Sequence, residues 1–188
     1  MADQLYLSYW LRGFTEFNML RHLGLLLQKF PVSRLAPDII VRVHAVALTE
    51  PFLMEQQFGL PLDIDDMLAA VRQHRAADIA VHLETKWDIW QKDTEWKLAP
   101  APVSIYAFGP AFERERDENI RIDFGPDFHF LPDVDDPSSA RLVQSNVRSL
   151  LSLVHSLDDT LAADRRQLWS ESGENFAERL QAALQQVL

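Results

Sequence analysis

Residues 79–89 read IAVHLETKWDI, and apolar and polar side chains alternate along the whole stretch. One face of an extended chain would carry Ile79, Val81, Leu83, Thr85, Trp87 and Ile89. The opposite face would carry His82, Glu84, Lys86 and Asp88. Such alternation is typical of a strand with one side against a core and the other toward water. The segment therefore predicts a strand in a sheet that helices cover on one side only.

Four further segments show the same alternation, beginning near Leu5, Ile39, Val103 and Ile120. Helical spacing of apolar residues separates the first three strands, and two more helical patterns follow the last strand. We therefore expect an α+β fold with a mixed, mostly antiparallel five-stranded sheet and helices on one face. The expected architecture is loosely ferredoxin-like, with two additional C-terminal helices. Helical connections between the first three strands favour parallel pairing among them.

The chain of 188 residues suits a single domain. We expect residues 1–136 to form the sheet core and residues 137–188 to form a helical pair packed on it. The stretch from Thr49 to Leu62 is interpreted as a long, packed connection, and Pro100 and Pro102 place the start of the fourth strand at Val103. The residues expected to be buried are Leu20, Leu23, Leu27, Val41, Val43, Ile79, Val81, Leu83, Ile105, Ile120 and Ile122.

The composition excludes several classes of function. Lys and Arg number 18 against 28 Asp and Glu, which gives a net charge of −10. Nucleic acids and anionic membranes both require a basic footprint, so we expect neither as a partner. Cysteine is absent, which removes disulfides and thiol catalysis. No apolar run is long enough to cross a bilayer and no signal-like segment opens the chain, so we expect a cytoplasmic location.

Histidines and carboxylates share the polar face of the predicted sheet. If the strands neighbour suitably, His44 and His82 would meet Glu84 or Asp123 as a two-histidine, one-carboxylate metal site or as an oriented general base. Alternating charges on an exposed sheet face also form ordinary cross-strand pairs, and that interpretation is the more common one. We therefore assign no metal, cofactor or catalytic residue.

Tryptophans are dense around the predicted turn at residues 91–95. Trp87 falls on the core face, whereas Trp90 and Trp96 flank the turn and Trp10 lies on the polar side of the first strand. Exposed aromatic rings serve as platforms for ligands or for protein partners, although most aromatic rings serve packing. The candidate ligand-binding residues are Trp10, Arg12, His44, His82, Glu84, Trp90, Trp96, Arg121 and Asp123.

Two hypotheses about function follow. The first is a non-enzymatic protein-binding or accessory module that uses the open sheet face or the Trp90–Trp96 hairpin, with a symmetric homodimer as the expected form of any self-association. The second is a small-molecule-binding domain or enzyme whose site surrounds His44, His82 and Asp123. A concave pocket lined by these residues would favour the second, and a flat face would favour the first.

Overall fold

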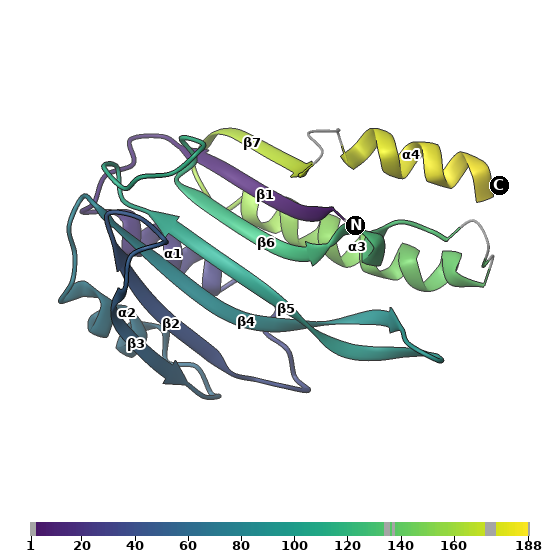
Figure 1. Ribbon diagram of the computed structural model, residues 1–188, viewed down its shortest axis with the longest axis horizontal. Coiled ribbons are helices and arrows are strands. Elements are labelled where there is room, and N and C mark those ends of the chain that lie inside the picture. Colours follow the sequence, from purple (N-terminus) through teal and green to yellow (C-terminus); the bar gives the residue numbers. More distant parts are fainter. Residues whose placement is uncertain (1–2, 134–135, 137, 172–175, 188) are drawn as a thin grey trace.

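The computed structural model shows an α+β fold built on one seven-stranded sheet (Figure 1). The structure describes residues 3–133, 136, 138–171 and 176–187, and the side chains of 182–187 are not described. The strand order is β3-β2-β4-β5-β6-β1-β7, and every neighbouring pair is antiparallel. The strands are β1 Gln4–Leu11, β2 Ile39–Ala45, β3 Phe52–Phe58, β4 Ile79–Lys92, β5 Trp96–Phe108, β6 Ile120–Pro126 and β7 Ala163–Ser170.

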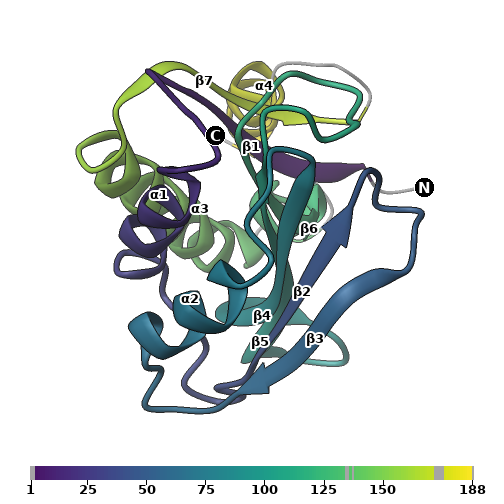
Figure 2. The ribbon, with the colours of Figure 1, turned by 90° about the vertical axis from the view of Figure 1, so that its left-hand side faces the viewer.

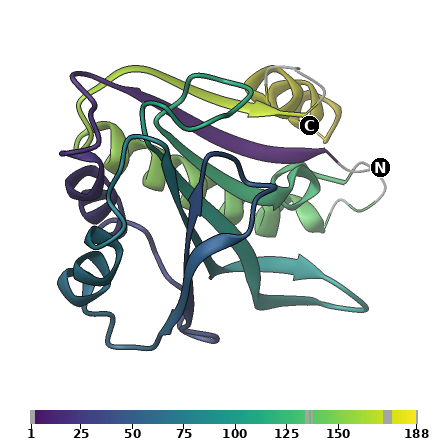
Figure 3. The ribbon, with the colours of Figure 1, turned by 60° about the vertical axis from the view of Figure 1, so that its left-hand side comes forward.

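Helices cover one face of this sheet. The α-helices are α1 Met19–Leu27, α2 Ile64–Arg72, α3 Ser139–Asp158 and α4 Phe176–Val187, with a 3-10 turn, η1, at Asp127–Phe130. Figure 2 shows α1, α2 and α3 on the same side of the strands, and Figure 3 shows α1 and α2 next to each other. Around β2, β4 and β5 the opposite face carries no helix in the described part of the chain. None of the described helices is long and apolar enough to cross a membrane.

The alternation in the sequence predicts the two faces correctly. Leu83 is fully buried, and so are the other apolar strand residues expected in the core. Leu20, Leu23 and Leu27 of α1 close the same core from the helical side. Trp87 is 1% exposed and packs against Phe30, Phe124 and Phe130. The core therefore lies between the sheet and the helices, and the even-numbered positions of β2, β4 and β5 lie on the open face.

The expected mixed, five-stranded, ferredoxin-like sheet is wrong. The segment interpreted as a packed connection contains β3, and a seventh strand, β7, lies between the two C-terminal helices and pairs with β1. The predicted parallel pairing among the first strands is also wrong. The α1 crossover does make β1 and β2 point the same way, but three other strands lie between them, so the two never pair. The expected boundary between core and helical pair, at residues 136–137, lies partly outside the described residues.

The fourth predicted strand begins earlier than expected. β5 starts at Trp96 and includes both Pro100 and Pro102, which face Asp88 and Lys86 of β4. Pairing of β5 with β6 covers only Ser104 to Ala107, so the proline-containing half of β5 has β4 on one side and no strand of the described residues on the other. Proline is tolerated at such a free strand edge because no ladder hydrogen bond is lost there. Figure 1 shows the resulting β4–β5 hairpin extending beyond the rest of the sheet.

The loop between β5 and β6 folds over one end of the open face. Phe112 of this loop packs on Phe108 and Ala80, which form a small apolar cluster separate from the main core. Gly109 permits the close approach, since a Cβ there would lie 2.3 Å from the Ala77 carbonyl oxygen. The amide of Glu113 also donates to the carbonyl of Val46, at 2.8 Å. The β5–β6 and β2–β3 loops are thereby joined above the open face.

Candidate functional site

Aromatic rings and arginines form a continuous row across the open face. His82 on β4 stands directly opposite Tyr106 on β5, and Tyr106 stands opposite Arg121 on β6. Residues directly opposite on antiparallel strands have Cβ atoms about 5 Å apart, which brings their side chains into contact. The row contains Phe52, His44, His82, Tyr106, Arg121, Tyr6 and Trp169, one residue from each of the seven strands.

The aromatic rings in the middle of this row stack face to face. The His82 and Tyr106 centroids are 4.4 Å apart with an interplanar angle of 11°, and Tyr106 and Phe108 are parallel at 5.7 Å. On the other side of Tyr106, the Arg121 guanidinium lies 4.9 Å from its ring centroid. Because the ring faces contact one another, it is their edges that remain for a ligand. Hydrogen bonding at ring edges is therefore a better fit to this surface than stacking.

Similar ring contacts connect the residues of the row on β1 and β7. Tyr6 stacks on Trp169 at 4.4 Å, and the Arg116 guanidinium lies 4.1 Å from the Trp169 ring. The Trp169 indole donates to the hydroxyl of Ser8 at 3.0 Å. The Trp169 indole and the Ser8 hydroxyl therefore partner each other, and the rings of this half of the face are packed together.

Both histidines of the row are neutral at physiological pH. Burial lowers the pKa of His82 to about 4, helped by the nearby charge of Arg42. Burial also lowers the pKa of His44, against an opposing contribution from the Glu50 backbone. The two rings are 6.0 Å apart, and His82 Nε2 lies 3.2 Å from the Ser104 hydroxyl. Both imidazoles are thus uncharged, and the two ring nitrogens of His44 are buried without a hydrogen-bond partner among the described residues.

Arg42 is already neutralised by two carboxylates. Its Nε donates to Glu55 on β3 at 2.6 Å, and one terminal nitrogen donates to Glu84 on β4 at 2.5 Å. These bonds raise the pKa of the arginine further. Glu84 therefore pairs with Arg42 and not with either histidine. The expected cross-strand charge pair is present, whereas the alternative that we considered, a contact between a carboxylate and a histidine, is not.

A hollow of about 470 Å³ opens beside these residues. Its floor is formed by Arg42, His44, His82 and Tyr106, and one wall is the β2–β3 loop from Leu48 to Phe52. Phe52 meets His44 edge to face, with centroids 6.0 Å apart. The volume falls within the range of about 300–1,000 Å³ that is usual for small-molecule sites. The hollow is concave, and both predicted histidines line it.

The remaining candidates lie away from the histidines. Asp123 is on β6, so β5 stands between it and His82, and its carboxylate accepts from the Gly125 amide at 2.9 Å. Burial raises the pKa of Asp123. Arg12 pairs with Asp164 at 2.9 Å, and Trp10 lies under the Arg165 guanidinium at 4.2 Å. Within the described residues, no three His, Asp or Glu side chains are placed to hold a metal.

The two hairpin tryptophans do not stack on each other in the described structure. The backbone of Trp90 is bonded to Asn146 of α3, and the Trp96 indole donates to Asp136 at 3.5 Å. Sequence reasoning missed Tyr106 and Phe52 as members of the site. Tyr106 could have been found, since it shares the parity of Ser104 on a strand whose odd positions are apolar. Phe52 could not, because its strand shows no alternation.

Searches against family models, curated proteins and solved structures found no match for this chain. The geometry of the open face is therefore the basis for assigning a function.

Proposed function

We propose that the protein binds a compact, uncharged small molecule in the hollow formed by Arg42, His44, His82, Tyr106 and the β2–β3 loop. The observation that carries this proposal is that the concave, partly buried surface of the hollow offers no free cation. Both imidazoles are neutral, and the one arginine is paired with Glu55 and Glu84. Burying an anion beside these groups and the Glu50 carboxylate costs free energy. Burying a cation beside the neutral imidazoles costs its hydration, which the solvent-exposed Glu50 offsets only weakly. An uncharged ligand with hydrogen-bonding groups avoids both costs.

Ring edges would provide the specific contacts. His82 and Tyr106 are stacked face to face, so their orientation is fixed before a ligand arrives. Preorganised groups bind more tightly because less side-chain freedom is lost on binding. Phe52 and the rest of the β2–β3 loop would cover the apolar side of the ligand. The site has the properties of a receptor for a ligand and contains no activated nucleophile, since a serine–histidine pair without an orienting acid is not a catalytic triad.

Three probes of the same shape but different charge test the expected preference for an uncharged ligand. Benzamide is neutral, benzoate is an anion and benzamidine is a cation, and all three are planar and similar in size. We expect benzamide to shift the NMR signals of His44, His82 and Tyr106 at lower concentrations than the two charged probes. Tighter binding of benzoate or benzamidine, or the absence of any shift at these residues, would refute the proposal.

A matched pair of variants localises the binding. His82→Phe keeps a flat ring on Tyr106 but removes both ring nitrogens, and it should weaken benzamide binding by roughly tenfold. His155→Phe makes the same chemical change at an exposed position on α3 and should leave binding unchanged. Equal effects of the two substitutions would show that the probe does not contact His82.

Protein binding remains a second candidate, and one observation favours it. Strand β3 lies at the edge of the sheet, with β2 on one side and no strand of the described chain on the other. Its apolar residues Phe52 and Leu53 are 47% and 54% exposed. Unpaired strand edges add further strands readily, and a second copy of β3 would form an antiparallel pair around a two-fold axis. Sedimentation of the wild type and Leu53→Lys tests this, since a single species near 21.6 kDa for both would exclude the dimer.

A further inference from the structure

A second and larger hollow lies on the helical side of the molecule. It has a volume of about 490 Å³ and is bounded by α3, by the segment that follows α1 and by the middle of β4. It shares no residue with the site proposed above. None of the candidate residues identified from the sequence lines it.

Three solvent-exposed cations line this hollow. They are Lys29 after α1, Arg34 in the loop before β2, and Arg148 on α3. None of the three forms an ion pair with a carboxylate in the described part of the chain. In a chain with a net charge of −10, three unpaired cations at one concave surface are unexpected for a purely structural role. Like charges held together repel one another unless an anion lies between them.

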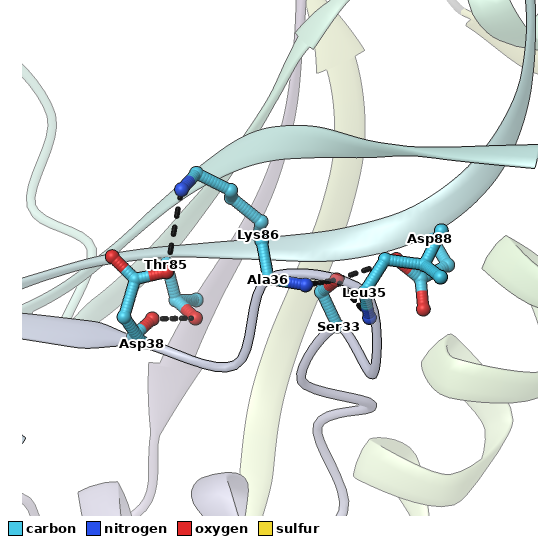
Figure 4. Close-up of polar contacts among 7 residues, drawn as sticks. All are labelled: Ser33, Leu35, Ala36, Asp38, Thr85, Lys86 and Asp88. Carbon is cyan, nitrogen blue, oxygen red and sulfur yellow. Dashed lines mark hydrogen bonds and ion pairs between the residues drawn. The ribbon is translucent and has the colours of Figure 1, made fainter. Parts of the chain in front are cut away.

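The loop that carries Arg34 is fixed to the sheet, as Figure 4 shows. Ser33 donates to Asp88 of β4 at 2.5 Å and accepts from the amides of Leu35 and Ala36. Further along, Thr85 donates to the carbonyl of Asp38 at 3.0 Å. Asp88 is the one carboxylate in the wall of the hollow, and it also accepts from the Arg34 amide at 2.8 Å. The backbone of Arg34 is therefore held in place before any ligand binds.

Serine hydroxyls line the α3 wall. Ser149, Ser152 and Ser156 follow one another at intervals of three and four residues, which places them on one side of a helix. Ser149 donates to the carbonyl of Ser145 at 3.1 Å. The hydroxyls of Ser152 and Ser156 make no hydrogen bond to any residue that the structure describes. Both remain available as donors to a ligand oxygen.

An independent observation comes from Trp87. This residue is 1% exposed and forms part of the wall, yet its indole nitrogen has no hydrogen-bond acceptor among the described residues. A buried N–H without a partner costs roughly 1–3 kcal/mol, so such groups are uncommon in native proteins. Because that nitrogen is itself buried, its N–H signal serves as a reporter in the wall of the hollow and not as an exposed donor.

We propose that this hollow binds a phosphate-bearing small molecule. The three cations and Asp88 give a local charge of +2, which matches the charge of about −1.5 to −2 on a phosphate monoester at pH 7. Lys29, Arg34 and Arg148 contact the phosphate oxygens, and Ser152 and Ser156 donate to those that remain. Pro31, Val32 and Leu153 form the apolar surface for the organic part of the ligand. This inference does not depend on the function proposed for the open face.

Titration with phenyl phosphate, phenyl sulfate and inorganic phosphate at low ionic strength tests the proposal. Phenyl phosphate is a dianion near neutral pH, whereas phenyl sulfate is a monoanion of similar shape. We expect phenyl phosphate to shift the indole N–H signal of Trp87, together with the amides of residues 29–34, and to bind at least about fivefold more tightly than phenyl sulfate. Inorganic phosphate should shift the same signals less. Equal binding of the two phenyl esters would exclude a phosphate-specific site.

Two substitutions on α3 provide a test of the site and its matched control. Arg148→Gln removes a cation from the hollow, and Arg141→Gln removes an exposed cation two turns earlier on α3. Both raise the net negative charge by one. We expect Arg148→Gln to weaken phenyl phosphate binding by about tenfold and Arg141→Gln to leave it unchanged. If both weaken it equally, the binding is a general charge effect and the proposal fails.

Vesicles distinguish a soluble ligand from a lipid headgroup. Sedimentation with vesicles that contain phosphatidic acid presents the same phosphate chemistry on a membrane. Binding of phenyl phosphate without vesicle binding supports a small molecule. Vesicle binding without any response to soluble phosphates would overturn the assignment.

Discussion

Asn146 in the middle of α3 and Trp90 near the end of β4 are joined by two hydrogen bonds of 2.8 Å each. The Trp90 amide donates to the Asn146 side-chain oxygen, and the side-chain nitrogen donates to the Trp90 carbonyl. The same nitrogen also donates to the carbonyl of His129, at 2.8 Å. Asn146 is 2% exposed, so these bonds are made away from water. One side chain thus satisfies three backbone groups where the hairpin leaves the body of the sheet.

Removing this side chain should destabilise the protein substantially. Asn146→Ala leaves a buried amide and two carbonyls without their partner, and we expect a loss of about 2–4 kcal/mol in the free energy of unfolding. Urea denaturation measures it. Gln144→Ala, at an exposed position on the same helix, is the control and should change stability by less than about 0.5 kcal/mol. Equal midpoints for Asn146→Ala and the wild type would show that the three bonds contribute nothing.

Arg179 should anchor α4 to the rest of the fold through its ion pair with the buried carboxylate of Asp127. Its guanidinium donates to Asp127 at 2.5 Å, and Asp127 is only 3% exposed. Burial raises the pKa of Asp127, and the arginine opposes that increase. Arg179→Ala leaves the carboxylate buried without this cation, and we expect it to cost about 1–3 kcal/mol at neutral pH.

The cost of Arg179→Ala should shrink as the pH falls. Loss of the arginine raises the pKa of Asp127 further, and the protonated acid no longer needs a cation. Thermal melts of both proteins at several pH values measure this difference. A second substitution, Asp127→Asn, should recover part of the lost stability at neutral pH. A constant difference at all pH values would show that Asp127 is not the partner that matters.

His82 should make stability depend on pH in a defined window. Its pKa is about 4 in the folded protein and about 6.5 in a flexible chain, so the unfolded state binds more protons between these values. Stability attributable to His82 is fully present above about pH 6.5 and is lost as the pH falls toward 4. The change is at most about 3 kcal/mol. Burial lowers the pKa of His22, His44 and His129 in the same direction, which adds to the slope.

His82→Phe isolates the contribution of this one ring. Denaturation midpoints between pH 7 and pH 4 should fall less steeply for His82→Phe than for the wild type or for His155→Phe. The comparison uses slopes, so any constant effect of the substitution on packing cancels. A slope unchanged by His82→Phe would mean that the imidazole titrates normally and faces water.

Leu83→Ala tests the register of the central strand. Leu83 is fully buried at the middle of β4, and truncation of such a residue costs about 2–5 kcal/mol. Equilibrium unfolding measures the loss. An unchanged midpoint would place Leu83 in solvent and reverse both faces of the sheet.

The strands that sequence reasoning found and missed differ in one physical respect. The interior strands β4 and β6 have one face in the core, so their apolar residues alternate and the faces could be predicted. The missed strands, β3 and β7, are the two edges of the sheet. β3 reads FLMEQQF and is exposed along nearly its whole length, while β7 reads ADRRQLWS and carries three consecutive charges. An edge strand covers little of the core, so burial imposes no regular pattern on its sequence.

The candidate site was only partly predictable for a related reason. Alternation places His44 and His82 on one face, but it does not say which strands are neighbours. That order brings the histidines together with Tyr106 and separates Asp123 from His82 by one strand and from His44 by two. The hollow on the helical side left no signal at all, because Lys29, Arg34 and Arg148 come from three different elements with no common spacing.

The pairing of β1 with β6 and β7 has a consequence for how the chain is made. β1 is complete at Leu11, yet its two partners begin at Ile120 and Ala163. At ribosomal rates of about 5–20 residues per second, roughly 8–30 s separate the synthesis of β1 from that of β7. Until β6 is made, Leu5, Leu7 and Tyr9 have neither neighbouring strand, and until β7 is made they have only one, although all three are fully buried at the end. Of the described strands β1 is made first, yet it is among the last to be enclosed, so a chaperone that binds apolar segments would have time to bind it during translation.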